Sequence, residues 1–154
     1  MRLLALAALT AMTGCATAET ENLPPLEVVT ISDAAGMQKQ AICSRARDWA
    51  AVTFKDSKAV VEVYDPVEGK MIGKGRMQVP VGLASFAIDF TLAVECKDGR
   101  FRSSFTDYYV QTNTGPFPLR VDDPINKLRT RAEARSKDMA ANLATFVTKK
   151  SADW

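Results

Sequence analysis

The chain has 154 residues, with 20 basic and 18 acidic side chains, so its formal net charge is only +2. This length fits one ordinary domain, and the near-neutral charge argues against a nucleic-acid partner. The sequence contains no histidine. That excludes a Ser-His-Asp triad, a Cys-His pair, histidine-ligated zinc and the usual general base near neutral pH. No motif in the sequence indicates a metal site or a cofactor.

Residues 1–14 have the layout of an export signal. Arg2 precedes an apolar run over residues 3–12, which is shorter than the roughly 20 apolar residues that a membrane-spanning helix needs. Residues 12–15 (MTGC) resemble the lipobox of bacterial lipoproteins, in which the signal peptidase cuts before the cysteine and the thiol carries a diacylglyceryl group. We therefore predict removal of residues 1–14 and lipidation of Cys15. The alternative is an ordinary secretory signal that is cut near residues 16–18.

The predicted lipid on Cys15 makes a membrane the first partner of the protein. The modification carries more than one acyl chain, and a single chain would bind a bilayer only reversibly. Residues 15–25 form the lipidated cysteine and a polar tether that ends in two prolines and spans at most roughly 30 Å. Ala16 stands where lipoproteins held at the inner membrane of Gram-negative bacteria often carry aspartate. The resemblance therefore implies the outer membrane, facing the periplasm. The length that remains predicts a single domain over residues 26–154.

The sequence contains three cysteines. If Cys15 is lipidated, Cys43 and Cys96 remain in an oxidising compartment, where they could form a disulfide. The alternative is two buried free thiols, which pack as small hydrophobic groups. Sequence alone does not supply the geometry that decides between these alternatives.

A strand and a helix are predicted at the start of the domain. Residues 26–31 (LEVVTI) are typical of a short strand. Ser32 and Asp33 are good helix caps, and the stretch that follows to about residue 52 predicts an amphipathic helix. Its apolar face is formed by Ile42, Ala46 and Trp49.

Four strands are predicted next. Residues 59–64 are rich in valine and end at a turn over residues 65–69. Residues 71–79 alternate between small or apolar and polar side chains, and residues 85–96 alternate most regularly, which indicates strands with one buried face. The Gly73-Lys74-Gly75 sequence lacks the spacing of a phosphate-binding loop. Its glycines therefore indicate a bulge or a close packing of the backbone on a helix.

The Asp98-Gly99 pair predicts a type I′ hairpin turn to the fourth of these strands. A two-residue turn determines the register, and this register places apolar residues opposite each other on one face and opposite charges on the other. The predicted pairs are Cys96 with Phe101, Leu92 with Phe105, Ile88 with Tyr109 and Glu95 with Arg102. Asp107 does not fit, because it would face Phe90 inside. We therefore expect either a bulge there or a position at the margin of the sheet.

Residues 112–121 (TNTGPFPLRV) predict a loop, and Asp123 with Pro124 predicts the start of a second helix. This helix has an apolar stripe and a largely basic remainder. It could lie on anionic lipid, but an apolar stripe is also what a helix that covers a sheet requires, and we favour that interpretation. The predicted fold is α+β: an antiparallel sheet of about five strands in the order β-α-β-β-β-β-α, with both helices packed on one face.

Three stretches carry a family resemblance. They are Trp49 with residues 54–61 (FKDSKAVV), residues 69–75 (GKMIGKG) and residues 94–102 (VECKDGRFR). Over about residues 26–109, the chain resembles a bacterial family of domains of unknown function that has a TATA-binding-protein-like fold and is often found in exported lipoproteins. The resemblance implies the fold described above and no activity. It does not imply DNA binding, because function resides in sites rather than in folds.

The open face of the predicted sheet is the candidate binding face. Lys74, Arg76, Arg100 and Arg102 are predicted to cluster there together with Tyr108. One interpretation is a polar site for an anionic glycan, a peptide or a lipid headgroup. The alternative is a solvated surface held by salt bridges, because acidic side chains share the face and no single sign of charge dominates it.

These observations favour a non-catalytic lipoprotein of the periplasm that binds an envelope protein or glycan. One alternative is a hydrolase that acts on an envelope glycan with carboxylates alone. It would need two convergent carboxylates, and the candidates are Asp89, Glu95 and Asp107. A second alternative is a carrier of a small apolar ligand between a helix and the sheet.

Overall fold

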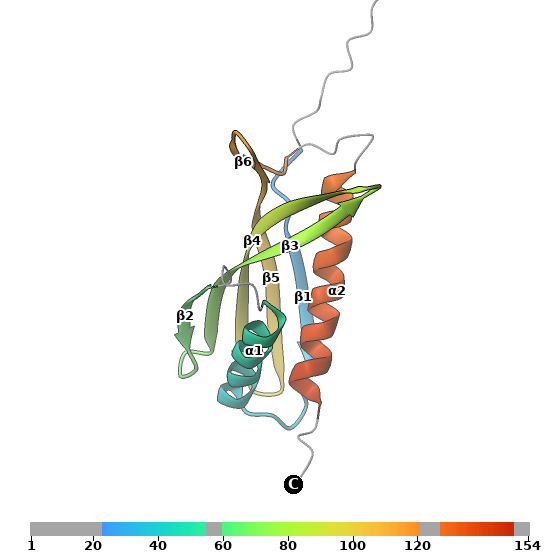
Figure 1. Ribbon diagram of the computed structural model, residues 1–154. Coiled ribbons are helices and arrows are strands. Elements are labelled where there is room, and N and C mark those ends of the chain that lie inside the picture. Colours follow the sequence, from blue (N-terminus) through green and yellow to red (C-terminus); the bar gives the residue numbers. More distant parts are fainter. Residues whose placement is uncertain (1–22, 55–59, 121–126, 150–154) are drawn as a thin grey trace, which may run out of the picture.

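The computed structural model describes residues 23–54, 60–120 and 127–149. Cys15 and the helix start predicted at Asp123 and Pro124 lie outside the described residues. Figure 1 shows the elements in chain order. They are β1 (Val28–Asp33), α1 (Lys39–Thr53), β2 (Val60–Asp65), β3 (Lys70–Val81), β4 (Ala84–Lys97), β5 (Arg100–Thr112), β6 (Gly115–Pro118) and α2 (Leu128–Thr148).

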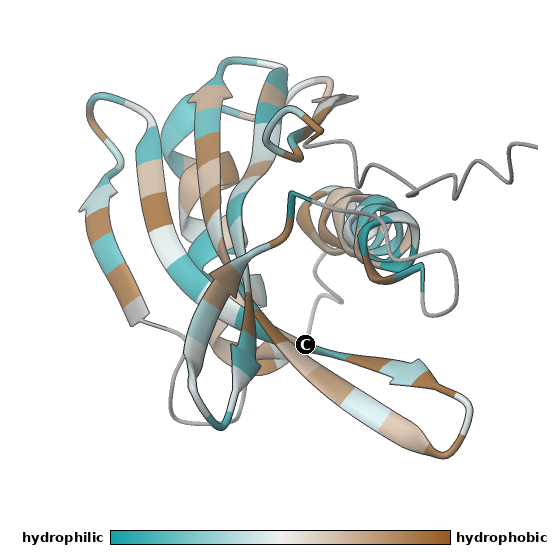
Figure 2. Cartoon of the chain, turned by 90° about the horizontal axis from the view of Figure 1, so that it is seen from above, coloured by the Kyte–Doolittle hydropathy of each residue, from teal (hydrophilic) through white to brown (hydrophobic). Residues whose placement is uncertain are grey.

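The strands form one antiparallel sheet with the order β1-β5-β4-β3-β2, and β6 pairs with β5. Both helices lie on the same face of this sheet and leave the other face open (Figures 1 and 2). The predicted α+β architecture is confirmed, with six strands in place of about five. Among the described residues, neither helix is both long and apolar enough to cross a membrane.

Strict alternation along the central strands builds the core. On β4, the buried residues are Ile88, Phe90, Leu92, Val94 and Cys96, and every second residue between them points to the open face. The helices close this core and are joined to each other, since Trp49 Nε1 of α1 donates a hydrogen bond to Asn142 Oδ1 of α2 at 2.7 Å. The core thus lies between the sheet and the two helices.

Gly75 leaves room on β3 for a large core side chain on β4. The two residues are directly opposite in the register, and a Cβ at Gly75 would lie 2.6 Å from Cζ of Phe90. The absence of a side chain is therefore required by the ring of Phe90. The predicted close packing of backbone is real, although its partner is this ring rather than a helix.

The β4–β5 hairpin keeps the predicted register near its turn. The confirmed pairs are Cys96 with Phe101, Glu95 with Arg102 and Leu92 with Phe105. Apolar residues face each other on the helix side and opposite charges face each other on the open side. The two-residue turn therefore determined this part of the sheet, as expected.

The predicted register is wrong beyond a β-bulge at Asp107. Here β5 contains one extra residue, and Asp107 adopts a left-handed backbone conformation with φ of 52°. Each later residue of β5 is shifted by one position, so that Ile88 faces Val110 and not Tyr109. Of the two alternatives for Asp107, the bulge is confirmed, and its side chain is exposed.

Helix α1 begins later than predicted. Ser32 and Asp33 are the last residues of β1, where they pair with β5. The helix starts at Lys39, and its first N–H is capped by Asp98 Oδ1 at 2.7 Å from the β4–β5 turn. The cap comes from a residue 59 positions away in the sequence, which is why the local sequence placed the start too early.

The segment predicted as a loop over residues 112–121 contains strand β6. Its prolines are tolerated because β6 is short and pairs only with the end of β5. Beyond β6, the carbonyl of Arg120 accepts the N–H of Leu23 at 2.9 Å. Residues assigned to the tether are therefore already bonded to the domain at position 23.

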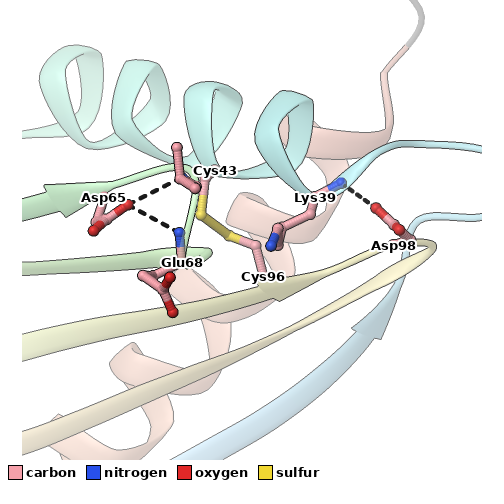
Figure 3. Close-up of a disulfide and its surroundings, with 7 residues drawn as sticks. Lys39, Cys43, Asp65, Glu68, Cys96 and Asp98 are labelled. Atoms are coloured by element: carbon pink, nitrogen blue, oxygen red, sulfur yellow. Dashed lines mark hydrogen bonds between the residues drawn. A yellow bond between two sulfur atoms is a disulfide. The ribbon is translucent and has the colours of Figure 1, made fainter.

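Cys43 on α1 and Cys96 on β4 are joined by a disulfide, with their Cα atoms 5.9 Å apart (Figure 3). The structure therefore contains the bond and not two free thiols. The bond lies beside the β4–β5 turn, where Asp98 caps the same helix. Helix α1 is consequently attached to the sheet twice within its first turns.

Candidate functional site

A hollow of about 570 Å³ lies on the open face of the sheet. Because side chains alternate along a strand, the residues between the buried core positions point into it. We call this site the sheet-face hollow, and its polar lining comes from three neighbouring strands. These lining residues are Lys74, Arg76, Asp89, Thr91, Asp107, Tyr109 and Gln111.

The centre of the hollow is a bidentate ion pair between Arg76 of β3 and Asp89 of β4. These residues are directly opposite in the register. Arg76 Nε and Nη2 lie 2.5 and 2.9 Å from the two oxygens of Asp89, and Gln111 Nε2 donates to Asp89 Oδ2 at 2.7 Å. The hydrogen bond to Asp89 raises the pKa of Arg76. A bidentate pair of this kind has a defined geometry, so the polar groups are positioned before any ligand arrives.

Lys74 lies two residues from Arg76 on the same face of β3. Its Nζ is 2.9 Å from Glu62 Oε1 on the edge strand β2. The hydrogen bond with Glu62 raises the pKa of the Lys74 ammonium group. The hollow therefore contains two basic groups that are already associated with carboxylates, and its charge is mixed rather than purely positive.

The bulge at Asp107 decides which tyrosine reaches the hollow. The prediction that Tyr108 lies on the binding face is wrong: its side chain is 4% exposed, and its hydroxyl is 2.7 Å from Ser136 Oγ of α2. Burial raises the pKa of Tyr108 to about 12. Tyr109 takes the place on the open face and is 42% exposed. The conflict of Asp107 with the hairpin register was the signal that could have revealed this.

Arg100 and Arg102 do not join Lys74 and Arg76. Arg102 Nη1 lies 3.8 Å from Glu95 Oε2, and Arg100 lies at the β4–β5 turn opposite Lys97. Glu95 is six residues from Asp89 along β4, which corresponds to about 20 Å at the usual rise of a strand. The predicted cluster therefore divides into two separate groups, and only Lys74 and Arg76 line the hollow.

Two of the candidate carboxylates, Asp89 and Asp107, share the hollow, whereas Glu95 lies outside it. Asp89 is bound by Arg76 and Gln111. Within the described parts of the chain, no group of three or more acidic or cysteine side chains is placed to hold a metal ion.

A smaller cavity of about 170 Å³ lies between the end of α1 and β3, beside Gly73 and Gly75. Ligand pockets usually measure roughly 300–1,000 Å³. This cavity is smaller than that range. A second hollow of about 370 Å³ lies between α2 and β3, but its lining includes Gln78, Arg131, Arg135 and Asp138, so it does not favour an apolar ligand.

The fold and the sheet-face hollow define an α+β domain whose antiparallel sheet is covered by two helices on one side and open on the other. Residues 29–111 match the family described as "Domain of unknown function (DUF4468) with TBP-like fold". Because this match covers more than half of the 154 residues, the chain belongs to that family.

Two solved structures share the fold. A DUF4468 family protein from Bacteroides ovatus is 12% identical and has a TM-score of 0.68, with 84% of this chain and 90% of that chain covered. A TBP-like protein from Parabacteroides distasonis is 10% identical and has a TM-score of 0.69, with 85% of this chain and 100% of that chain covered. At these identities the likeness shows the fold alone. No curated protein matches the chain.

Proposed function

We propose that the protein is a lipid-anchored periplasmic domain that binds an envelope component in the sheet-face hollow and performs no catalysis. The observation that carries this proposal is the positioned group of Arg76, Asp89 and Gln111 on an open sheet face. Sites for small ligands combine a concave surface with a few placed polar groups. The predicted export signal and the predicted lipid on Cys15 support this location.

The size and the lining of the hollow favour a glycan chain over a protein surface as the ligand. Its volume of about 570 Å³ falls within the roughly 300–1,000 Å³ that is usual for ligands of small size. Tyr109 offers an exposed ring beside the fixed ion pair, so one ligand could use an apolar face and several hydrogen-bonding groups together. Mixed charge in the hollow fits a polar ligand better than a strongly anionic one.

Photo-crosslinking in intact cells tests the binding site. A photoreactive amino acid replaces Thr91, which lines the hollow, or Arg102, which lies outside it. We expect adducts from position 91 only, and mass spectrometry of these adducts distinguishes a glycan from a protein. The Arg76→Lys variant keeps the charge but loses the bidentate geometry, so it should weaken the adduct, whereas Arg102→Lys should not. Equal adducts from both positions would contradict the proposal.

The anchor is tested separately by mass spectrometry of the protein isolated from membranes. We expect an amino-terminal Cys15 with attached lipid, and a Cys15→Ala variant should leave the membrane fraction. An unlipidated chain that begins near residues 16–18 would overturn the anchor and establish ordinary secretion.

A hydrolase that acts on envelope glycan is the second candidate, because Asp89 and Asp107 line the same hollow. Binding is favoured over hydrolysis because Asp89 is engaged by Arg76 and Gln111, whereas a glycosidase needs one carboxyl group that gives up a proton to the leaving group. Release of reducing ends from purified envelope glycan, lost in Asp107→Asn, would favour the hydrolase.

A further inference from the structure

Two exposed apolar side chains lie at the end of the molecule that carries the β3–β4 turn and β6. Leu83 at that turn is fully exposed (110%), and Phe117 on β6 is 53% exposed. Figure 1 places both β6 and this turn at the same end as the start of α2, and Figure 2 shows the β3–β4 hairpin projecting from the body with hydrophobic residues towards its tip.

Both protruding segments also lack charge. No charged residue occurs over residues 77–88 or over residues 108–119. The turns at the opposite end, residues 65–70 (DPVEGK) and 97–100 (KDGR), are rich in charge. Ile31 and Val67 are exposed there too, but each has charged neighbours. Ile31 pairs with Arg102, and Val67 lies between Asp65 and Glu68. The two ends of the sheet therefore differ in the surface they present.

A series of contacts places the entry of the chain at the end with the β3–β4 turn and β6. Leu23 donates its N–H to the carbonyl of Arg120 directly after β6. Arg129 Nη1 donates to the carbonyl of Leu119 at 3.2 Å, and Arg131 Nη1 donates to the carbonyl of Pro80 at 3.4 Å. The first residues of α2 thus connect the end of β6 with the β3–β4 hairpin, and Leu23 enters beside them.

The tether is too short to hold this end far from a membrane. Leu23 is eight residues from Cys15, so the chain between them spans at most about 26 Å. We infer that the end with the β3–β4 turn and β6 rests on the bilayer that holds the anchor, with Leu83 and Phe117 in the interfacial region. This inference depends on the anchor in the proposed function, but it does not depend on what the sheet-face hollow binds.

The tether also explains why few apolar side chains suffice. Once the lipid is inserted, contact between the tip and the bilayer is intramolecular, so its effective concentration is set by the short tether. Leu and Phe are among the side chains that interfacial protein segments bury at the boundary of headgroups and acyl chains. In this orientation the end with the charged turns at residues 65–70 and 97–100 faces away from the membrane.

Depth-dependent quenching on vesicles tests the orientation. The lipidated full chain is reconstituted into vesicles of phosphatidylethanolamine and phosphatidylglycerol, with an environment-sensitive fluorophore on Leu83→Cys or, as the matched control, on Val67→Cys. Both positions are exposed turn residues, so labelling should preserve the fold, which the thermal unfolding midpoint checks. We expect quenchers carried on lipid to act several-fold more strongly at position 83 than at position 67.

Other outcomes are informative in different ways. Protein that floats with the vesicles but is quenched equally weakly at both positions would overturn the inference and leave the anchor intact. Protein that does not float would overturn the anchor and the inference together. A probe at position 83 that is shielded from aqueous iodide but not reached by lipid quenchers would indicate a protein contact, which also overturns the inference. A Leu83→Asp substitution should weaken lipid quenching of a probe on Phe117→Cys, whereas Val67→Asp should not.

Discussion

The two ends of the sheet differ in how firmly their turns are attached to the body. At the disulfide end, Asp98 caps α1 through the N–H of Lys39, and Asp65 accepts hydrogen bonds from the N–H groups of Val67 and Glu68 within its own turn. The bond between Cys43 and Cys96 joins the helix to the sheet at the same end. At the other end, the β3–β4 hairpin extends beyond the helices and carries a fully exposed leucine.

This difference means that one end contributes to the stability of the protein, whereas the other end offers surface to a partner. A leucine that is fully exposed buries no apolar area on folding and so contributes little to the stability of the free protein. Its surface therefore remains available for a partner. The disulfide end has the opposite character, because hydrogen bonds and the disulfide hold it within the chain.

The largest effect is expected from removing the disulfide. Cys43→Ala together with Cys96→Ala, in a Cys15→Ser background that removes the remaining thiol, should lower the free energy of unfolding by about 4 kcal/mol. This follows from the 53-residue separation of the two cysteines and the entropy of an open loop in the unfolded chain. Chemical denaturation measures the loss, and the reduced parent should match the variant. A loss below about 2 kcal/mol would show that this end is not where stability is concentrated.

A smaller loss is expected at the middle of the sheet. In Gly75→Ala the new Cβ would lie 2.6 Å from the ring of Phe90, and overpacking of this kind typically costs about 1–3 kcal/mol. Combining it with Phe90→Leu should cost less than the sum of the two single changes, because the clash and the ring are removed together. Additive losses in denaturation experiments would show that the ring of Phe90 is not the reason why position 75 requires glycine.

The fold was predictable where the determinants are local. Alternation on β4 and the two-residue turn at Asp98-Gly99 defined the buried faces and the register near the turn. The start of α1 was not predictable from its own sequence, because the cap is Asp98. The choice between a disulfide and free thiols required the distance between Cys43 and Cys96, which only the packed structure supplies.

The candidate site was predicted in part. Lys74 and Arg76 reach the hollow because they share one face of one strand. Tyr108 was misplaced because a single inserted residue reverses every later side chain of a strand. Arg100 and Arg102 were misplaced for another reason: residues on one face of a long strand can still be about 20 Å apart.

The buried tyrosine should make the protein sensitive to alkali. Burial raises the pKa of Tyr108 to about 12, above the ordinary value of about 10, so the folded protein keeps a proton that the unfolded chain releases. Stability that is present below pH 10 should therefore be lost as the pH rises towards about 12. Denaturation at a series of alkaline pH values measures this loss.

Two variants isolate that contribution. Tyr108→Phe should remove this part of the alkaline loss, at a cost of about 1 kcal/mol at neutral pH for the hydrogen bond to Ser136. Ser136→Ala removes the same hydrogen bond but keeps the ionisable phenol, so its alkaline loss should persist. An unchanged pH dependence in Tyr108→Phe would assign the alkaline loss to another group.

The smallest effect is expected at the tip of the β3–β4 hairpin. Leu83→Ala should change the free energy of unfolding of the free protein by less than about 0.5 kcal/mol, as is usual for surface substitutions. Leu92→Ala is the matched control, because it removes the same atoms from a leucine that is 2% exposed on β4, and it should cost about 2–5 kcal/mol. A clear loss for Leu83→Ala would mean that Leu83 packs against the body in solution. In that case the side chain of Leu83 would not be free to contact the bilayer. The proposed difference between a stabilising end and a contact end would then be contradicted at Leu83.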